Sequence, residues 1–332
     1  MRPAPGKRQA PEDPGDGTAP ARPGRADEAA GVAVVEAQRA GLLRLAYSMV
    51  GVWGDADDLV QAAYERWYRL TPTQRAGIDR PGAWLRTAAS RLCLTHLDSA
   101  RVRRERYVGP WLPEPLPAHH HPEPGPLEQA TVRESVDMAL LVVLETLTPA
   151  QRVAYVLHEV FGVPYTEIAE ILARSPAATR QLATAARRHL HDTRTRPAGA
   201  TEHARLVAAF RHACEYGDLE ELIRVLDPQV TSISDGGGMT GVARRPITGA
   251  DKVARFLLGS LAKRRHTVSV QDTEVNGRPG LAIISQAPAT PPTVIGIVAF
   301  DTTPGCIRQV WITMNPDKLR TWNTPRPDPH DS

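Results

Sequence analysis

Apolar side chains recur at helical spacing through most of the first 190 residues of the chain. Apolar positions lie three, four or seven residues apart with polar positions between them, which is typical of helices that bury one face. Glycine and proline interrupt this pattern and set the ends of the helices. The predicted helices cover residues 34–51, 55–70, 81–106, 132–147, 153–161, 166–172 and 176–190.

The last third of the chain has a different pattern. Helical spacing predicts helices at 202–216, 219–226 and 250–261, and alternating or apolar runs predict strands at 230–234, 266–275, 281–285, 293–300 and 307–314. The pair Asn276-Gly277 stands between two of these strands and is a strong signal for a tight hairpin. Helices followed by neighbouring strands predict an α+β domain with an antiparallel sheet.

Segments rich in proline, glycine and charge separate these blocks. A chain of 332 residues exceeds what one core usually holds, so several domains are expected. The first segment has hardly a large apolar side chain, and burial cannot offset the entropy of ordering it. The predicted boundaries are a disordered tail at 1–32, a helical domain at 33–107, a proline-rich linker at 108–130, a second helical domain at 131–194, a short linker at 195–201, an α+β domain at 202–322 and a disordered tail at 323–332.

Composition narrows the cellular setting. The net charge is only +3, and the isoelectric point of about 8.9 reflects clusters of arginine, which makes nucleic acid a candidate partner. Cys93, Cys214 and Cys306 lie far apart without the spacing of a zinc site or a disulfide framework. No apolar run approaches the roughly 18 residues of a membrane span, and no signal peptide is recognisable. The pattern predicts a cytoplasmic protein that is not bound to a membrane.

The proline-rich linker contains three adjacent histidines, His119 to His121. No acidic or cysteine partner stands at ligand spacing, so neither a metal nor a cofactor is expected there. A solvated linker is the better interpretation of this segment, because its proline content excludes a helix.

The helices predicted at 166–172 and 176–190 are separated by a short break, which indicates a helix-turn-helix. Ser175 before Pro176 pairs a helix-capping side chain with a proline in the first helical turn. The inner face of the second helix is expected to hold Ala178, Leu182 and either Ala185 or Ala186.

The outer face of this second helix carries basic and amide side chains, which suit the major groove of DNA. Arginine and glutamine read base edges through paired hydrogen bonds, and the helix N-terminus favours phosphate. A solvated basic face on an ordinary helical hairpin is the alternative. The candidate DNA-binding residues of this helix are Thr179, Arg180, Gln181, Thr184, Arg187 and Arg188.

A second basic cluster ends the helix predicted at 81–106. Arg101, Arg103 and Arg104 are candidates for contact with DNA phosphates. The alternative is a solvated helix end whose positive charges complement the helix dipole. Dipole interaction also explains Asp55, at the start of the helix predicted at 55–70.

Taken in order, these segments resemble the extracytoplasmic-function RNA polymerase sigma factors, specifically the subgroup with a fused SnoaL-like C-terminal domain. The match covers nearly everything after the N-terminal tail. In the two helical domains it rests on GDADDLVQ at 54–61, Trp67, AWL at 83–85, RLCL at 91–94, LTPAQR at 147–152, GVPYTEIA at 162–169 and RQLA at 180–183. The segments that resemble the subgroup itself are YVGPWLPEP at 107–115, DGGG at 235–238 and NPDKL at 315–319.

The resemblance implies two all-α sigma domains, the second a helix-turn-helix, followed by an α+β SnoaL-like domain of the NTF2-like class. It implies that the first domain docks on core RNA polymerase and meets the minus-ten promoter element through its third helix. The second domain would place residues 177–190 on the minus-thirty-five element. The polymerase-binding residues implied are Asp57, Asp58, Gln61 and Glu65.

The resemblance also implies that the C-terminal domain is a built-in regulator, so that no separate anti-sigma factor is required. We hypothesise that it packs against the first sigma domain and the linker, and that its pocket has room for an unidentified small ligand. Ordinary turn chemistry is the alternative for its loops, because glycine and Asn-Pro-Asp favour turns in any protein. The implied contact residues are Asp235, Gly236, Gly237, Gly238, Asn315, Pro316, Asp317, Lys318 and Leu319.

Four positions depart from the family pattern. Thr95 and Asp98 stand where the family commonly has aspartate and arginine, Ala185 replaces a usual arginine, and Met239 replaces a frequent lysine. An acid near phosphate repels it, so contact with DNA near Asp98 is expected to be weaker.

An enzymatic interpretation of the C-terminal domain competes with the regulatory one, since SnoaL-like domains include isomerases and cyclases. Such chemistry needs a base and an oxyanion donor in an apolar pocket. Asp235, Asp272 and Glu274 have no evident catalytic partner, and Tyr216 is the domain's single tyrosine. The expectation is therefore a promoter-specificity subunit without enzymatic activity, and the alternative is a stand-alone DNA-binding regulator fused to a small-molecule enzyme.

Overall fold

The structure is a computed structural model that describes residues 35–104, 107–120, 137–193, 196–239, 242–264, 266–286 and 291–324; the side chains of 101–104, 119 and 193 lie outside this description. The chain divides into two compact units, Met1–Gln38 and Arg39–Ser332. The arrangement below concerns the second unit. The predicted tails at 1–32 and 323–332 fall almost wholly outside the described residues.

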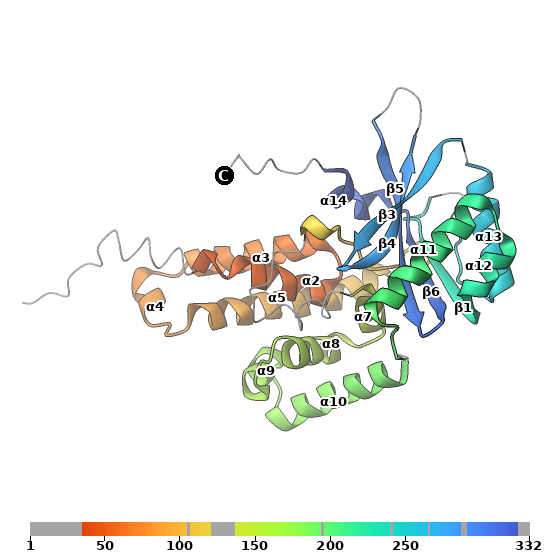
Figure 1. Cartoon of the computed structure of the whole chain (residues 1–332). Coiled ribbons are helices and arrows are strands. Elements are labelled where there is room, and N and C mark those ends of the chain that lie inside the picture. The colour runs from red at the N-terminus through yellow and green to blue at the C-terminus, as the bar shows by residue number, and fades with distance from the viewer. Residues whose placement is uncertain are drawn as a thin grey trace, which may run out of the picture. The chain divides into compact units, whose positions relative to one another are not determined.

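The first helical domain is built from α2 (Arg39–Val50), α3 (Trp53–Tyr68), α4 (Pro72–Ala76) and α5 (Pro81–Arg104) (Figure 1). Its core holds fully buried Tyr47, Met49, Val60 and Leu85, as the helical spacing predicts. The short helix α4 was not predicted. It begins at a capping box in which Thr71 and Gln74 satisfy each other's backbone N–H groups.

The linker is extended over 107–117 and largely buried there, which contradicts the prediction of a solvated segment, and the 3-10 helix η1 (Ala118–His120) follows, although the proline content predicted no helix. Prolines alternate with other residues at 113, 115 and 117, so every second position carries no N–H group. Each remaining N–H finds an acceptor: Leu112 donates to Asp235 Oδ2 at 3.0 Å, Glu114 to the Gly51 carbonyl at 2.8 Å and Leu116 to Asn276 Oδ1 at 3.0 Å. Burial therefore leaves none of these backbone donors unpaired.

The second helical domain contains α7 (Met138–Leu144), α8 (Pro149–Tyr155), the π-helix η2 (Val156–Val160), α9 (Tyr165–Leu172) and α10 (Pro176–Thr193). The turn between the last two helices passes through Ala173, which is left-handed with φ 51°. Ser175 then caps α10 by accepting a 3.2 Å hydrogen bond from the N–H of Ala178, as predicted. The helix-turn-helix is thereby confirmed as a structure.

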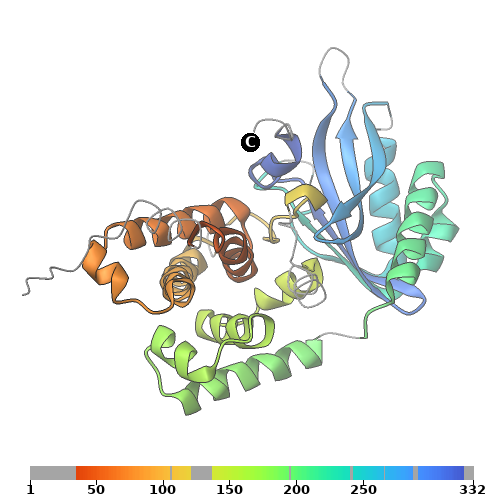
Figure 2. The same ribbon diagram turned by 60° about the vertical axis from the view of Figure 1, so that its left-hand side comes forward.

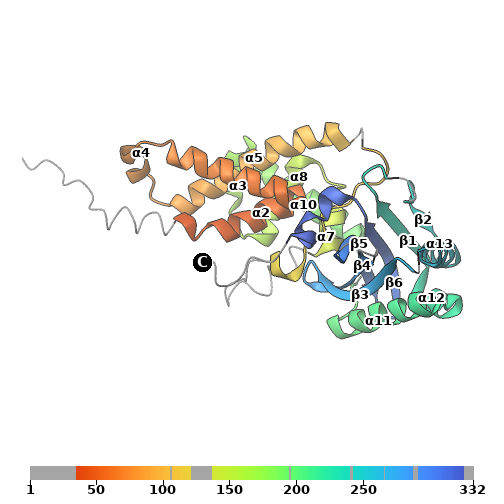
Figure 3. The same ribbon diagram turned by 90° about the horizontal axis from the view of Figure 1, so that it is seen from above.

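The C-terminal domain packs helices on a mixed sheet (Figures 1 and 3). Its helices are α11 (Ala200–Tyr216), α12 (Leu219–Val225) and α13 (Ala250–Ala262), followed by η3 (Pro316–Lys318) and α14 (Arg320–Asn323). Its strands are β1 (Leu226–Asp235), β2 (Ile247–Thr248), β3 (Val268–Val275), β4 (Arg278–Ser285), β5 (Thr293–Thr303) and β6 (Cys306–Thr313), in the order β2-β1-β6-β5-β4-β3.

The predicted antiparallel sheet is wrong in one place, because β1 pairs with β6 in parallel while the other neighbours are antiparallel. Residues Thr231 and Asp235 lie opposite Gln309 and Thr313 in this parallel pairing. Parallel neighbours need a long crossover, and here α13 and the four intervening strands β2 to β5 supply it. The first strand also begins four residues earlier than predicted.

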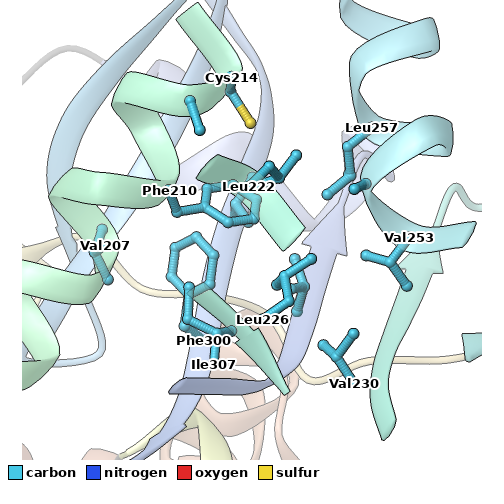
Figure 4. Packing of buried hydrophobic residues seen from close by; sticks show 14 of the residues in the cluster. Val207, Phe210, Cys214, Leu222, Leu226, Val230, Val253, Leu257, Phe300 and Ile307 are labelled. Atoms are coloured by element: carbon cyan, nitrogen blue, oxygen red, sulfur yellow. The ribbon is translucent and has the colours of Figure 1, made fainter. Parts of the chain in front are cut away.

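The two faces of the sheet are covered differently. Helices α11, α12 and α13 cover one face (Figure 2), where Phe210 and Phe300 meet edge to face with ring centroids 4.9 Å apart (Figure 4). On the other face the linker residue Leu112 and Met138 of α7 join a cluster around Trp311. The C-terminal domain therefore shares a hydrophobic core with the linker and with α7 of the second helical domain.

Among the described residues, no helix combines the length and the apolar character needed to cross a membrane.

Candidate nucleic-acid interface and linker anchor

Helix α10 presents the basic stripe predicted for it, with one correction. Its inner face holds Thr179, Ala183, Ala186 and Leu190, all at most 4% exposed. The predicted inward residues Ala178 and Leu182 are only half-buried, Ala185 is exposed, and Ala186 is correctly assigned. The outer face carries exposed Arg180, Gln181, Arg187 and Arg188, with Thr184 half-buried.

Thr179, a predicted DNA-binding residue, lies on the inner face of α10 and not on its outer face. Its side chain is fully buried, and its hydroxyl donates a 3.1 Å hydrogen bond to the carbonyl of Ser175 one turn earlier. Threonine is small enough to pack on the inner face while its hydroxyl bonds the backbone of the same helix. The residue stabilises the start of α10 from inside.

Two arginines of the outer stripe already contact side chains of their own domain. Arg187 forms an ion pair with Glu159 of η2, which raises the pKa of the Arg187 guanidinium. Arg180 lies 5.4 Å from the ring centroid of Tyr165, which in turn stacks on His158 at 3.9 Å. These contacts orient both guanidinium groups in the free chain.

Helix α5, the predicted third helix of the first domain, contacts the helix-turn-helix. Arg86 of α5 pairs with Glu167 of α9 at 2.9 Å, and Arg91 donates to the carbonyl of Glu170 at 3.1 Å. Nothing in the local pattern around Arg86 predicts this contact, since a basic residue on a helix suits solvent equally well. The side chains of Arg101, Arg103 and Arg104 lie outside the described residues.

A buried arginine makes a further contact between the helical domains. Arg152 of α8 is 3% exposed, and its Nη1 donates to the carbonyl of Met49 at 2.9 Å and pairs with Glu145 at 2.6 Å. Burial lowers the pKa of Arg152 to about 10. The group remains charged at neutral pH, and Glu145 provides the counter-charge that burial requires.

Helix α3 leaves an acidic and amide face exposed. Asp58, Gln61 and Glu65 are exposed at spacings of three and four residues, which places them on one side of the helix. Asp57 is half-buried and pairs with Arg39 at 2.5 Å. The first three side chains are accessible to a partner protein, whereas the fourth is already engaged.

The departures from the family pattern lie on exposed surfaces. Thr95 donates a 3.0 Å hydrogen bond to the carbonyl of Arg91, which leaves the surrounding helix undisturbed. Asp98, Ala185 and Met239 are exposed as well. None of these four side chains contributes to a core.

The most densely bonded polar site of the described C-terminal domain surrounds Asp235, at the end of β1. Its buried carboxylate accepts hydrogen bonds from the N–H of Leu112 at 3.0 Å, the hydroxyl of Tyr107 at 2.5 Å and Lys318 Nζ at 2.6 Å. The ammonium of Lys318 also lies 4.0 Å from the ring centroid of Trp111 and donates to the carbonyl of Leu112. The charged side chains of Asp235 and Lys318 thus hold the linker in place. We call Tyr107, Trp111, Leu112, Asp235 and Lys318 the linker anchor.

The glycines that follow Asp235 are required by close packing. A Cβ atom on Gly237, where φ is +59°, would lie 2.7 Å from the side chain of Asn315, and one on Gly236 would lie 2.9 Å from Val242. Asn315 donates to the hydroxyl of Tyr107 at 2.9 Å and accepts from the N–H of Asp317 at 3.0 Å. The DGGG and NPDKL segments therefore meet each other and the linker.

The remaining expected contact residues divide by exposure. Leu319 is buried in the core shared with the linker, and Pro316 starts η3. Asp317 is exposed and pairs with Arg320 of its own segment, and Gly238 is exposed with φ +86°. Of these four residues, only Leu319 belongs to the hydrophobic core that the C-terminal domain shares with the linker.

A second contact to the linker was not predicted. Asn276, left-handed at φ 50° and fully buried, accepts the N–H of Leu116 at 3.0 Å and donates to the hydroxyl of Tyr47 at 2.8 Å. The Tyr47 hydroxyl in turn donates to the carbonyl of Glu114 at 2.6 Å. An Asn-Gly pair signals a hairpin through its backbone, and nothing in that signal shows that the amide also reaches another domain.

Glu114 joins the linker to the start of α3. Its buried carboxylate accepts a 2.7 Å hydrogen bond from the N–H of Trp53, the first residue of that helix. Burial is the largest influence on this carboxyl group and raises its pKa to about 7. The linker is thus bonded to the first helical domain through Glu114 and to the C-terminal domain through Leu112 and Leu116.

Comparison with known proteins agrees with this architecture. Residues 34–103 match the model of the family "Sigma-70 region 2", and residues 137–190 match "Sigma-70, region 4". The chain is 38% identical over 297 residues to "ECF RNA polymerase sigma factor SigJ" of Mycobacterium tuberculosis, which covers 87% of this chain and 93% of that protein. It is 36% identical over 293 residues to "Probable ECF RNA polymerase sigma factor SigI" of the same species, with coverage of 85% and 92%.

A solved structure extends the likeness to three dimensions. The crystal structure of the Mycobacterium tuberculosis extracytoplasmic function sigma factor SigJ matches with a TM-score of 0.67 and 35% identity, covering 87% of this chain and 98% of that one. Sequence and fold therefore agree over both helical domains and the C-terminal domain. The chain belongs to the extracytoplasmic-function RNA polymerase sigma factors of the SigJ type.

Proposed function

We propose that this chain binds core RNA polymerase, directs it to promoters and controls that activity through its own C-terminal domain. The observation that carries the proposal is the presence, in one chain, of sigma-70 regions 2 and 4 joined by a linker that the C-terminal domain holds at Asp235 and Asn276. Sigma domains bind core polymerase and promoter DNA, so the cytoplasm is the compartment in which the chain acts.

The residue roles follow from exposure. Arg180, Gln181 and Thr184 read bases of the minus-thirty-five element, while Arg187 and Arg188 neutralise phosphates. The basic end of α5, with Arg101, Arg103 and Arg104, meets the minus-ten region. On α3, Asp58, Gln61 and Glu65 form the polymerase-binding face, and Asp57 takes part once it exchanges its pairing with Arg39.

The free chain holds its promoter-reading helices in contact with acidic side chains. Glu167 pairs with Arg86 of α5, and Glu159 pairs with Arg187 of α10. Carboxylates in these positions compete with DNA phosphates for the same guanidinium groups. The proposed regulation is that the linker anchor stabilises this self-contacting state and that polymerase and promoter together open it. No separate anti-sigma factor is then needed.

The C-terminal domain acts in this scheme by contact and not by catalysis. The cavity between its helices and its sheet is lined by apolar side chains together with Cys214, Ser234, Ser260 and Arg264. General acid–base chemistry uses a histidine, a carboxylate, a lysine, a tyrosine or a cysteine at the reacting atom, and of these the described lining contains only Cys214, whose pKa burial raises to about 12. No observation favours the enzyme alternative.

Transcription with reconstituted holoenzyme tests the proposal. Promoter fragments are selected from fragmented genomic DNA with core polymerase and the full-length chain, and transcripts are mapped. Fragments that share two elements and yield defined transcript starts are the expected result. The double variant Arg180→Ala/Gln181→Ala should lose at least about tenfold in transcript yield, because each base contact contributes roughly 1–3 kcal/mol. Arg205→Ala on exposed α11 is the matched control.

Two results would overturn the proposal. One is a chain that never co-elutes with core polymerase, which fits a stand-alone DNA-binding regulator. The other is a holoenzyme that forms but starts no transcript on any fragment.

A further inference from the structure

A cavity lies between α11, α13 and the helix-covered face of the sheet. Figure 4 shows Phe210 of α11 and Leu257 of α13 directed into the space between these two helices. The cavity has a volume of about 80 Å³, enough for several water molecules, and its surface is overwhelmingly apolar. Further apolar lining comes from Val242, Phe256, Leu261, Val268, Val270 and Met314.

The polar groups of the described lining include a positive charge and no negative charge. Within the described residues, the guanidinium of half-buried Arg264 and the hydroxyls of Ser234 and Ser260 have no hydrogen-bond partner. Burial raises the pKa of the Cys214 thiol to about 12, so it lines the wall as a neutral group. The described lining contains no carboxylate, and Arg264 supplies its single positive charge.

This composition selects the ligand. An apolar body gains free energy by leaving water for the cavity, and a carboxylate gains a charge-assisted hydrogen bond from Arg264. An amine would face the same guanidinium as a like charge, and an alcohol would leave that positive charge without a counter-ion. The lining therefore favours a small carboxylic acid with an apolar body.

The cavity wall and the linker anchor are directly connected through the backbone at the end of β1. Ser234 lines the cavity and Asp235, the next residue of β1, points to the opposite face and holds the linker. Met314 lines the cavity, and its N–H donates to the carbonyl of Asp235 at 2.7 Å. A ligand that shifts either wall residue must also shift the anchor.

The loop after β1 provides a second route. Val242 lines the cavity, and its side chain packs so closely on Gly236 that a Cβ atom there would lie 2.9 Å away. Gly236 directly follows Asp235, and Gly237 packs on Asn315, which bonds Tyr107 of the linker. Movement of Val242 against a bound molecule therefore reaches the same anchor.

We propose that this cavity binds a small monocarboxylic acid with an apolar body, held by Arg264, and that its occupancy changes the grip of Asp235 on the linker. Binding and its effect on the amide of Leu112 do not depend on whether the chain directs transcription. The effect on transcription rests on the proposed function.

Calorimetric titration of the full chain tests the ligand class. The probes are butyrate and isobutyrate, as straight-chain and branched acids small enough for a cavity of about 80 Å³, with butan-1-ol and butylamine as uncharged and cationic counterparts of the first. One molecule of at least one acid should bind per chain, with the acid stronger than the alcohol and no binding of the amine. Arg264→Gln should weaken acid binding by about tenfold or more, because hydrogen bonds to charged groups are strong.

The controls separate binding from misfolding. Arg205→Gln removes an exposed arginine of α11 outside the cavity and should leave binding unchanged. Ser260→Leu fills part of the cavity at a half-buried position and should abolish acid binding while thermal unfolding shows an intact domain. Absence of binding by both acids, equal binding of the alcohol, or unchanged affinity in Arg264→Gln would each overturn the proposed ligand class.

Hydrogen exchange tests the coupling without reference to transcription. The amide of Leu112 donates to Asp235, so its exchange rate reports the anchor directly. A saturating acid should change this rate by about fivefold or more, the lower end of usual coupling between sites. An unchanged rate under saturation would overturn the coupling. A changed rate in a chain that directs no transcription would support the site and contradict the proposed function instead.

Discussion

Two regions of this molecule hold charged side chains in opposite ways. At the linker anchor, Lys318 and Asp235 are 6% and 0% exposed in their side chains and face each other at 2.6 Å. At the helix-turn-helix, Arg187 is 53% exposed and pairs directly with Glu159 at the protein surface. Breaking a buried pair leaves an uncompensated charge, whereas an exposed pair exchanges partners at little cost. The contrast assigns a fixed role to the first region and an exchangeable one to the second.

Removing one charge of the anchor should give the largest effect. Lys318→Met leaves the Asp235 carboxylate buried without its counter-charge and should lower the free energy of unfolding by about 3–5 kcal/mol. Urea denaturation of the full chain measures this. Arg320→Met removes one partner of an exposed pair nearby and should cost only about 0–1 kcal/mol. Equal losses in the two variants would contradict the contrast.

The pH dependence of stability probes the other end of the linker. Because burial raises the pKa of Glu114 to about 7, the folded chain binds a proton there that the unfolded chain has already released. The free energy of unfolding therefore decreases as pH rises from about 4.5 to 7, by on the order of 3 kcal/mol.

The variant Glu114→Gln removes this titration but retains an acceptor for the N–H of Trp53. Subtracting the stability of the variant from that of the parent chain, measured at several pH values by urea denaturation, should isolate the decrease. A difference that stays flat between pH 5 and 7.5 would show that the carboxylate keeps an ordinary pKa.

The second contact to the linker should matter somewhat less. Asn276→Gly keeps the left-handed backbone but removes the amide that accepts from Leu116 and donates to Tyr47. One buried N–H then lacks its partner, and the free energy of unfolding should fall by about 1–3 kcal/mol. Tyr47→Phe, which removes one hydroxyl, should cost about 1 kcal/mol on the same urea curve. An unchanged free energy of unfolding in Asn276→Gly would mean that water replaces the amide.

The sequence was sufficient for elements with strong periodicity and insufficient wherever partners lie far apart in the chain. Apart from the short α4, the helices of both sigma domains and the capping role of Ser175 follow from local spacing and turn chemistry. The burial of the proline-rich linker does not, because the acceptors for Leu112 and Leu116 are Asp235 and Asn276, more than 120 residues away.

The same limit explains two other errors. The parallel pairing of β1 with β6 depends on how the chain crosses over, which strand periodicity cannot show. Thr179 was assigned to the outer face because α10 is rich in alanine, and alanines at 178, 183, 185 and 186 allow more than one inner stripe. The expected contacts of Asp235, Asn315 and Lys318 came from family resemblance, and their partners on the linker are visible only in the structure.

The smallest expected effect lies at the exchangeable pair. Glu159→Gln removes the carboxylate that competes for Arg187, so affinity for a selected minus-thirty-five fragment should rise by about two- to fivefold, the usual range for an exposed ion pair. The dependence of affinity on salt should steepen as well, because a freed guanidinium neutralises one more phosphate. Fluorescence anisotropy at several salt concentrations measures both quantities. Glu221→Gln, which removes an acid paired with His212 in the C-terminal domain, should change neither. Lower affinity in Glu159→Gln would mean that Glu159 positions Arg187 for DNA, and the pair at the helix-turn-helix would then belong with the fixed contacts of the linker anchor.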